Sequence, residues 1–333
     1  MESSQRSKVM VIGAGGVGRV VVQGLARLPY LTEIIIADID GMRAQMVAQA
    51  SRDRRVVARA VDAGNQQEVA AAADGCRIVI HAGIPRLNFS VMEACLQVGA
   101  HYIDMASDGP VPLPGLVTVQ EQMARYHDAF RAQGLLALLG IGSDPGVSNI
   151  LARWAYDTLH TVESLVIYDG DNSASQDGVF ALPFSPDTSI EECLQPPLTF
   201  SGGEFVLGAA LETGIEVFHF PDPIGPLVTR SVAHEEVGTL PLFLGGKGLQ
   251  RCEFKYALSD EYVTILKVLH TLGLDREDLV PLGGISVSPR KLVASLLPSP
   301  SDLGNAFEGS SCVGVKVQGM KADGTAVEWF LYT

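Results

Sequence analysis

The stretch KVMVIGAGGVGRVVVQGLARLPYLTEIIIADID, residues 8–40, decides the fold of this chain. A short apolar run ends at Gly13, glycines recur at Gly15, Gly16 and Gly18, and an apolar segment of helical length follows. A run of three isoleucines then predicts a second strand. Strand, glycine-rich turn, helix and strand in this order are typical of a dinucleotide-binding βαβ unit, whose glycine pattern is G-x-G-x-x-G.

Each residue type in this unit has a physical role. Gly13 permits the tight turn out of the strand, Gly15 leaves room for a pyrophosphate at the helix N-terminus, and Gly18 lets the helix approach the sheet. Asp38 follows Gly18 by 20 residues (38 − 18) and ends the second strand. Its carboxylate would accept hydrogen bonds from ribose hydroxyls and repel a 2′-phosphate, so the expected cofactor is NAD. A glycine-rich turn without a ligand is the less favoured alternative.

Alternating strand and helix patterns continue to about residue 139 and predict an α/β fold with a doubly wound parallel sheet of the Rossmann type. Ligands of such sheets lie beyond the carboxyl ends of the strands. The residues expected to bind the cofactor share this edge: Gly13, Gly15, Gly16, Val17, Gly18, Asp38, Ile39, Asp62, Ala63, His81, Ala82, Gly83, Asp144, Pro145 and Gly146.

The loop GIGSDPGVSN, residues 140–149, follows the expected sixth strand, where a nicotinamide ring would lie. Asp144 suits a helix N-cap and Pro145 the first helical position, so this loop is expected to open a helix over residues 150–159. This structural interpretation of the loop requires no ligand. The cofactor domain is therefore assigned to residues 1–146.

Beyond residue 162 the pattern changes to short β-rich runs separated by loops rich in Pro, Gly, Asp and Ser. This texture predicts a second α+β domain, residues 147–333, built on a mixed and largely antiparallel sheet. Two helices are expected within it, at residues 263–272 and 288–297.

Composition limits the possible partners. The 333 residues carry a formal charge of −14, which argues against nucleic acid and anionic membrane surfaces. Five cysteines without C-x-x-C spacing indicate reduced thiols in a cytoplasmic protein, with no metal site expected. No apolar run is long enough for a membrane helix, and the N-terminus lacks a signal core. We expect a small-molecule substrate.

Several longer segments carry a family resemblance: VIGAGGVG, ADID, GAHYIDMA (99–106), GIGSDPGVSNILA (140–152), FPDPIGPL (220–227) and HEEVGTLP (234–241). In these segments and their order the chain resembles the saccharopine dehydrogenase family, in particular its saccharopine reductase-like and lysine 6-dehydrogenase-like members. The resemblance implies a Rossmann domain with an inserted substrate domain, NAD(P)-dependent oxidation of an amine C–N bond or the reverse reaction, and a homodimer. Chains of this family continue into a C-terminal helix, which we expect to be absent here because the sequence stops at Thr333 within an expected strand.

Amine oxidation needs a hydride path and a base whose pKa lies near neutrality, which suits histidine or a buried carboxylate. The catalytic candidates are His81, Asp104, His234 and Glu236, and the substrate-binding candidates are Arg230 and Asn149; Asp108 flanks the same strand end as Asp104. Each has a structural alternative. His81 could only cap its strand, Asp104 and Asp108 could only stabilise loops, and His234 with Glu236 could be a polar pair that stabilises a loop. Arg230 could be a solvated surface charge rather than a partner for a substrate carboxylate.

The leading hypothesis is an NAD-dependent oxidoreductase of amino acids or opine-like secondary amines that works through an imine. One variant of this hypothesis keeps NAD bound through both half-reactions, as in the similar homospermidine and carboxynorspermidine enzymes. A hypothesis of another class is a non-catalytic NAD(H)-binding subunit or sensor, because a Rossmann scaffold alone does not establish catalysis.

Overall fold

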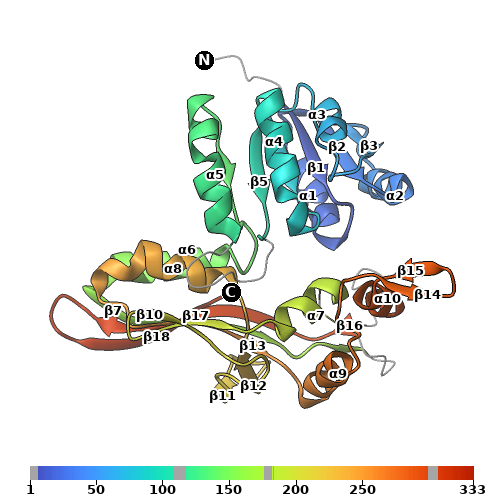
Figure 1. Cartoon of the computed structure of the whole chain (residues 1–333). Helices are drawn as coiled ribbons and strands as arrows, with labels where there is room; N and C mark the ends of the chain where they lie inside the picture. Colours follow the sequence, from blue (N-terminus) through green and yellow to red (C-terminus); the bar gives the residue numbers. More distant parts are fainter. Residues whose placement is uncertain (1–6, 108–117, 176–181, 183, 299–306) are drawn as a thin grey trace. The chain divides into compact units, whose positions relative to one another are not determined.

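The computed structural model describes residues 7–107, 118–175, 182, 184–298 and 307–333, which form two compact units. The division falls between Gly146 and Val147, and each unit is described separately. Figure 1 traces the elements of both. Among the described helices, none combines the length and apolarity needed to span a membrane. All five cysteines are buried and form no disulfide, as expected from the sequence.

Unit 1 is a six-stranded parallel sheet in the order β3-β2-β1-β4-β5-β6. The strands are β1 (Ser7–Ile12), β2 (Leu31–Asp38), β3 (Val56–Ala60), β4 (Ile78–His81), β5 (His101–Asp104) and β6 (Ala137–Leu138). The helices are α1 (Gly16–Ala26), α2 (Gly41–Ser51), α3 (Gln66–Ala72), α4 (Asn88–Val98) and α5 (Thr118–Ala132), with the 3-10 turn η1 (Pro85–Leu87) before α4. This strand order is the Rossmann arrangement predicted from the sequence.

The central strands of unit 1 are apolar on both faces because helices cover both faces. Met10 and Ile12 join one buried cluster with Ile35, whereas Val9 and Val11 join the other. Side chains alternate between the faces of a strand, so an uninterrupted apolar run of this kind requires two buried faces. The carboxyl ends of β1, β2, β4 and β5 consequently lie along one edge of the sheet, because all pairs are parallel.

Unit 2 has an eight-stranded mixed sheet with the central order β10-β9-β13-β7-β17-β18, extended by β12 against β13 and β11 against β12. Its strands are β7 (Thr161–Asp171), β9 (Leu198–Ser201), β10 (Glu204–Leu207), β11 (Glu216–His219), β12 (Pro226–Ser231), β13 (Arg251–Ala257), β17 (Ser311–Met320) and β18 (Ala326–Tyr332). Outside this sheet, β14 (Val280–Leu282) pairs with β15 (Ile285–Val287), and β8 (Ala174–Ser175) pairs with β16 (Phe307–Glu308). In the large sheet only β7 and β13 pair in parallel, so the predicted largely antiparallel sheet is confirmed.

The helices of unit 2 are α6 (Val147–Thr158), α7 (Pro186–Leu194), α8 (Glu235–Leu244), α9 (Asp260–Thr271) and α10 (Pro289–Leu296), with the 3-10 turn η2 (Gly245–Lys247). In Figure 1, α6 and α8 lie side by side over one face of the large sheet. Two of these helices, α7 and α8, were not expected. The segment 234–241 was interpreted as a loop, and it is instead the first half of α8 with Pro241 inside it.

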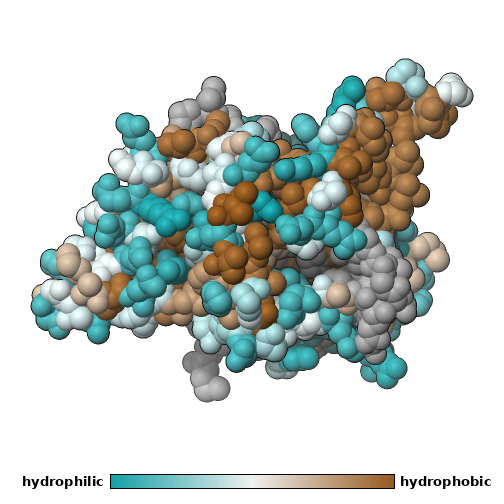
Figure 2. All heavy atoms as spheres, turned by 90° about the horizontal axis from the view of Figure 1, so that it is seen from below, coloured by the Kyte–Doolittle hydropathy of each residue, from teal (hydrophilic) through white to brown (hydrophobic). Residues whose placement is uncertain are grey.

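Apolar side chains are exposed on the hairpin β14–β15 of unit 2, where Leu282 and Ile285 are more than half exposed. The projecting apolar end on the right of Figure 2 matches the position of this hairpin on the right of Figure 1. The buried cysteines, by contrast, belong to the packed interior.

Candidate functional site

The glycine turn of unit 1 has the geometry of a phosphate cradle. Gly13 adopts a φ of +98°, and a Cβ there would lie 2.5 Å from the carbonyl oxygen of Ala82. A Cβ on Gly18 would lie 1.8 Å from the carbonyl oxygen of Gly13. Gly15 and Gly16 instead face open space, with no atom within 4 Å of a Cβ placed on either. Glycine is therefore required at Gly13 and Gly18 by contacts within the chain, whereas Gly15 and Gly16 leave space for a ligand.

The N-terminus of α1 is free to bind an anion. Gly15 is its N-cap, and among the described residues no side chain caps it and no acid lies in its first turn. Backbone N–H groups at a helix N-terminus and the helix dipole both favour a phosphate. Val17 is exposed in this first turn, and its contact with the cofactor stays a prediction. These residues fit the pyrophosphate of a dinucleotide.

Asp38 is held in a fixed orientation at the end of β2. Its Oδ2 accepts the N–H of Ala14 at 2.8 Å, and its Oδ1 accepts the N–H of Asp40 at 2.9 Å. A carboxylate oxygen can accept further hydrogen bonds, so Asp38 can still accept ribose hydroxyls. Asp40 has a different role, because its carboxylate caps α2. Ile39 between them is 74% exposed and can flank an adenosine.

The residues that follow β3 and β4 at the cofactor edge of the sheet differ in their exposure. Asp62 is exposed, and its Oδ1 accepts the N–H of Gly64 at 2.8 Å. Ala63 is buried, whereas Gly83 is exposed and Ala82 half-buried. The exposed and half-buried positions stay compatible with cofactor binding.

His81, at the end of β4, is buried and pairs with a neutral amide. Its side chain is buried, and its Nδ1 lies 2.8 Å from Asn88 Oδ1. Asn88 donates through Nδ2 to Asp104 and to the carbonyl of Ala106, which leaves its Oδ1 as the acceptor and assigns the His81 proton to Nδ1. Burial lowers the pKa of His81 to about 4, although the hydrogen bond to Asn88 opposes this shift. Burial therefore favours the neutral ring, and the role of His81 as a base stays a prediction.

Asp104 is the centre of a buried polar network rather than an open catalytic group. Its Oδ2 accepts hydrogen bonds from Tyr102, Gln122 and Asn88 at 3.0–3.1 Å, and its Oδ1 accepts the N–H of Gly140 at 2.6 Å. Its side chain is 1% exposed. These contacts fit the alternative in which Asp104 positions the loop after β6. Asp108 lies outside the described residues.

The loop at residues 140–146 differs from its predicted form. The Asp144–Pro145 bond is cis, and α6 begins at Val147, so Pro145 precedes the helix and does not occupy its first position. Gly142 N–H donates to the Pro145 carbonyl at 2.8 Å, and a Cβ on Gly146 would lie 2.2 Å from the Gly142 carbonyl oxygen. The loop therefore closes on itself, and Gly146 is required for that closure.

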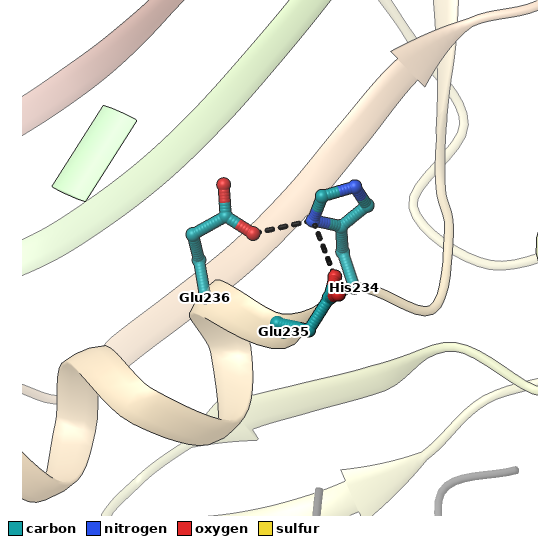
Figure 3. A group of neighbouring side chains, drawn as sticks. All are labelled: His234, Glu235 and Glu236. Atoms are coloured by element: carbon teal, nitrogen blue, oxygen red, sulfur yellow. Dashed lines mark hydrogen bonds and ion pairs between the residues drawn. The ribbon is translucent and has the colours of Figure 1, made fainter. Parts of the chain in front are cut away.

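In unit 2, three charged side chains meet at the start of α8. His234 is the N-cap residue, and its Nδ1 pairs with Oε2 of Glu236 and lies 3.4 Å from Oε2 of Glu235. The imidazole stacks on the ring of Phe254 in β13, with centroids 3.7 Å apart. The other oxygen of Glu236, Oε1, accepts the hydroxyl of Ser148 in α6 at 2.7 Å. Figure 3 shows both carboxylates on the Nδ1 side of the imidazole, with Nε2 directed away from them.

The electrostatics of this cluster favour an ionised pair. Burial by itself would lower the pKa of His234, but the carboxylates of Glu236 and Glu235 outweigh it and raise the pKa well above its ordinary value. Burial likewise opposes ionisation of Glu236, but His234 and the hydroxyl of Ser148 bring the pKa of that carboxyl below its ordinary value. A buried histidine cation and a buried carboxylate thus stabilise each other.

The same three side chains could also hold a cation, since their ligand atoms lie within 4.8 Å of one another. A metal at His234 would have to displace the proton that His234 shares with Glu236, because metal ligands bind deprotonated. The expectation that the protein binds no metal stays a prediction.

Arg230 lies on the same sheet face and is not the solvated surface charge of the alternative interpretation. It is 8% exposed, and its Nη1 donates to the carbonyl of Leu211 at 3.2 Å, whereas Nη2 lies 3.4 Å from Asp260. Its Nε is buried without a hydrogen-bond partner among the described residues. Four residues of extended chain, about 13 Å, separate Arg230 from His234. Asn149 is half-buried in α6, next to Ser148.

The first of the comparisons with known proteins is at the level of sequence. The family model of the saccharopine dehydrogenase NADP binding domain matches residues 9–138. Carboxyaminopropylagmatine dehydrogenase of Synechocystis sp. is 30% identical over 332 residues, which cover 98% of this chain and 81% of that protein. The chain belongs to the saccharopine dehydrogenase family. A second relative, carboxynorspermidine synthase of Vibrio cholerae, is 29% identical over 97% of this chain and 80% of its own.

Solved structures agree with this assignment at the level of fold. Saccharopine dehydrogenase (L-Glu forming) of Saccharomyces cerevisiae superposes with a TM-score of 0.67 at 13% identity and covers 98% of this chain and 85% of its own. Homospermidine synthase of Legionella pneumophila, solved with NAD, gives 0.66 at 16% identity, with coverage of 98% and 78%. The protein is accordingly an NAD(P)-dependent dehydrogenase of the saccharopine dehydrogenase family.

Two residues of the unit 2 cluster were missed by reasoning from sequence. Ser148 was noted only as part of the loop at 140–149, and Phe254 only as part of a strand. Nothing in local sequence connects Ser148 to Glu236, which is 88 positions away. One signal was available in the sequence. Ser148 lies on the buried face at the start of α6, where a polar side chain needs a hydrogen-bond partner.

Proposed function

We propose that this protein is an NAD-dependent oxidoreductase that forms or breaks the C–N bond of a secondary amine joining an amino-acid fragment to a polyamine. The names of the two curated relatives support this substrate class, since both combine a carboxyl group with a polyamine. This class lies within the opine-like amines expected from the sequence. It also coincides with the carboxynorspermidine-type variant of that hypothesis.

The cofactor preference follows from Asp38. A bound nicotinamide dinucleotide would supply the hydride acceptor or donor, with its pyrophosphate at Gly15 and Gly16. The fixed carboxylate of Asp38 suits two ribose hydroxyls and opposes a 2′-phosphate. This is the basis for NAD over NADP.

The observation that carries the proposal is the buried ion pair of His234 and Glu236. Oxidation of an amine removes a hydride from carbon and a proton from nitrogen, and water then hydrolyses the imine to a carbonyl compound and a free amine. The reverse reaction returns one proton to the departing hydroxyl of the carbinolamine. His234 holds such a proton on an imidazole whose Nε2 is directed away from both carboxylates. Glu236 keeps that proton on the ring at neutral pH, and Ser148 holds Glu236 in place.

Charge recognition is the second part of the proposal. His234, Glu235 and Glu236 sum to one negative charge, which attracts the ammonium groups of a polyamine. Arg230 has a buried Nε without a partner and suits the carboxylate of the amino-acid fragment. A substrate with both groups would use both ends of this sheet face.

The test is a spectrophotometric assay of nicotinamide absorbance with purified protein. One arm combines NADH with amino-acid aldehydes or 2-oxo acids and with diamines, agmatine or simple amines. The other combines NAD⁺ with lysine, saccharopine, ornithine and carboxylated polyamines. We expect turnover to require both an amine cation and a carboxylate. Glu236→Gln should lower kcat by about 10²–10⁴ and leave NADH affinity unchanged, whereas Glu204→Gln, at an exposed site on β10, should change neither.

Normal turnover by the Glu236→Gln variant would refute the assignment of this cluster. Absence of turnover with every substrate, together with tight NADH binding, would favour a non-catalytic NAD(H)-binding subunit or sensor. Cofactor that stays with the protein through gel filtration would favour the variant that retains NAD. The same column with light scattering tests the homodimer, which stays a prediction.

A further inference from the structure

Unit 1 contains a basic pocket at the edge of the sheet opposite the cofactor edge. Its volume is about 790 Å³, and its lining includes Arg27, Arg52, Arg54 and Arg55. Arg27 is the C-cap of α1, Arg52 is the C-cap of α2, and the other two precede β3. A pocket of this size is in the range that holds small organic ligands.

One of the four arginines has a structural role. Arg55 forms a forked pair with Asp53, with Nε 3.1 Å from both carboxylate oxygens, and donates to the carbonyls of Leu28 and Leu31 at 2.8 and 2.9 Å. It also donates to the carbonyl of Ala26 at the end of α1. Arg55 therefore neutralises the one acid of the lining and satisfies the carbonyls around the end of α1.

The other three arginines are uncommitted. Arg27, Arg52 and Arg54 are exposed, and in the part of the chain that the structure describes none forms a side-chain hydrogen bond or ion pair. Two helix C-termini contribute about half a negative charge each, so a positive charge of roughly two remains. The chain as a whole carries −14. A local positive excess in so acidic a protein cannot be explained by its average composition.

Helix capping does not fully explain these residues. Arginine near a helix C-terminus can complement the dipole, but at the end of α1 the carbonyls of Ala26 and Leu28 already bind Arg55. Arg52 has a φ of 54°, a left-handed conformation usually taken by Gly or Asn at this position. Arg54 caps no helix and still lines the pocket.

The pocket is separate from the cofactor site. Arg55 contacts Leu31 at the first residue of β2, whereas Asp38 is the last residue of that eight-residue strand. At about 3.3 Å per residue the two ends lie roughly 23 Å apart. A ligand in this pocket would therefore not compete with the dinucleotide for space.

We infer that this pocket binds a small anion that carries phosphate groups. Guanidinium groups offer paired N–H donors whose geometry matches phosphate oxygens, and three arginines without partners among the described residues line this pocket. Among the described residues of the lining none is aromatic, so recognition rests on the anion's charge and not on stacking of a base. The inference is independent of the reaction proposed above.

The test is isothermal titration of the full chain with inorganic pyrophosphate at low ionic strength, with and without saturating NADH. The main variant combines Arg27→Gln, Arg52→Asn and Arg54→Gln, with Asn chosen because it tolerates the left-handed conformation. The matched control is Arg131→Gln, which removes an exposed arginine from the last turn of α5 in the same unit. Because the readout is binding, it does not depend on any turnover.

We expect the triple variant to bind pyrophosphate at least about tenfold more weakly, Arg54→Gln alone about threefold more weakly, and the control like wild type. Saturating NADH should remove any pyrophosphate binding at the N-terminus of α1 and change the affinity of the arginine pocket by less than about twofold. Arg54→Gln keeps both helix caps, so its loss of binding cannot come from a frayed helix. Undetectable binding to the wild type, unchanged binding by the triple variant, or complete competition by NADH would each overturn the inference.

Discussion

Replacing Glu236 with glutamine should change how the stability of unit 2 depends on pH. The native pair consists of a His234 whose pKa is raised and a Glu236 whose pKa is lowered. A raised histidine pKa stabilises the fold fully below the unfolded value of about 6.5, and this contribution is lost as the pH rises through the folded pKa. A lowered carboxyl pKa stabilises the fold above about 4.3, and that contribution is lost as the pH falls through the folded pKa. The pair therefore contributes most between about pH 4.5 and 6.5.

The magnitude follows from linkage. Each pH unit between the unfolded and folded pKa of His234 removes about 1.36 kcal/mol of unfolding free energy. From pH 6.5 to 8.5 the wild type should lose up to about 2.7 kcal/mol that the Glu236→Gln variant does not lose, since its His234 lacks the buried carboxylate partner. At pH 6 the variant should be less stable by about 3 kcal/mol, in the range for breaking a buried pair. The difference in unfolding free energy between the wild type and the Glu236→Gln variant should therefore decrease as the pH rises.

The positions of the tryptophans make the assay specific to unit 2. The chain has two, Trp154 in α6 and Trp329 in β18, and their rings lie 5.8 Å apart. Urea unfolding followed by tryptophan fluorescence at pH 5.5, 6.5, 7.5 and 8.5 thus reports on this unit. Glu204→Gln is the control, because Glu204 is exposed. The ionised pair would be refuted if the difference in unfolding free energy between the wild type and Glu236→Gln did not change with pH. The same holds if Glu204→Gln showed the same pH-dependent difference.

Three further predictions concern unit 1. Asp38→Ser should weaken NADH binding by about 10- to 100-fold. It should also narrow the difference in affinity between NADH and NADPH, and titration of nicotinamide fluorescence measures both affinities. Gly18→Ala should destabilise the unit by about 1–3 kcal/mol, because its Cβ would overlap the Gly13 carbonyl. Gly24→Ala, in the exposed last turn of α1, should be neutral or stabilising, and thermal unfolding by circular dichroism compares the two variants. Asp104→Asn should cost at least about 3 kcal/mol and speed hydrogen exchange in the loop after β6, because buried donors lose their charged acceptor. Equal exchange in that loop would contradict the network described for Asp104.

The sequence was sufficient to predict unit 1 because local and global signals agree there. Its strands are apolar runs, its helices have a period near 3.6, and its turn needs glycine for steric reasons that one residue type satisfies. In unit 2, α8 was missed because Gly238 and Pro241 lower its helix propensity. The helix forms nevertheless, since its buried face packs on the sheet, and tertiary packing outweighs propensity.

Site chemistry was less predictable than the fold, because burial decides the state of an ionisable group and burial is not local. His81 and His234 both stood out as histidines after expected strands or turns. The first lies against an amide, and burial lowers its pKa; the second lies against two carboxylates, which raise its pKa despite burial. The partner of His81 is a neutral amide, Asn88, whereas the partner of His234 is a carboxylate, Glu236. The sequence alone could not show that His234, and not His81, is the histidine that favours the protonated form.

Two buried carboxylates were catalytic candidates, Asp104 in unit 1 and Glu236 in unit 2, and they differ in the donors that they accept from. Asp104 accepts hydrogen bonds from an amide N–H, a phenol and side-chain amides, and all of these donors stay protonated near neutral pH. Its environment can hold a loop in place, but none of these donors releases its proton near neutral pH. Glu236 accepts from an imidazole, whose proton can leave at a cost that neighbouring charges determine. A substrate ammonium beside Glu235 and Glu236 would weaken their hold on the His234 proton, since two cations would then share the two carboxylates. Binding of the amine would thereby bring the histidine pKa down toward the pH at which it can act as both acid and base.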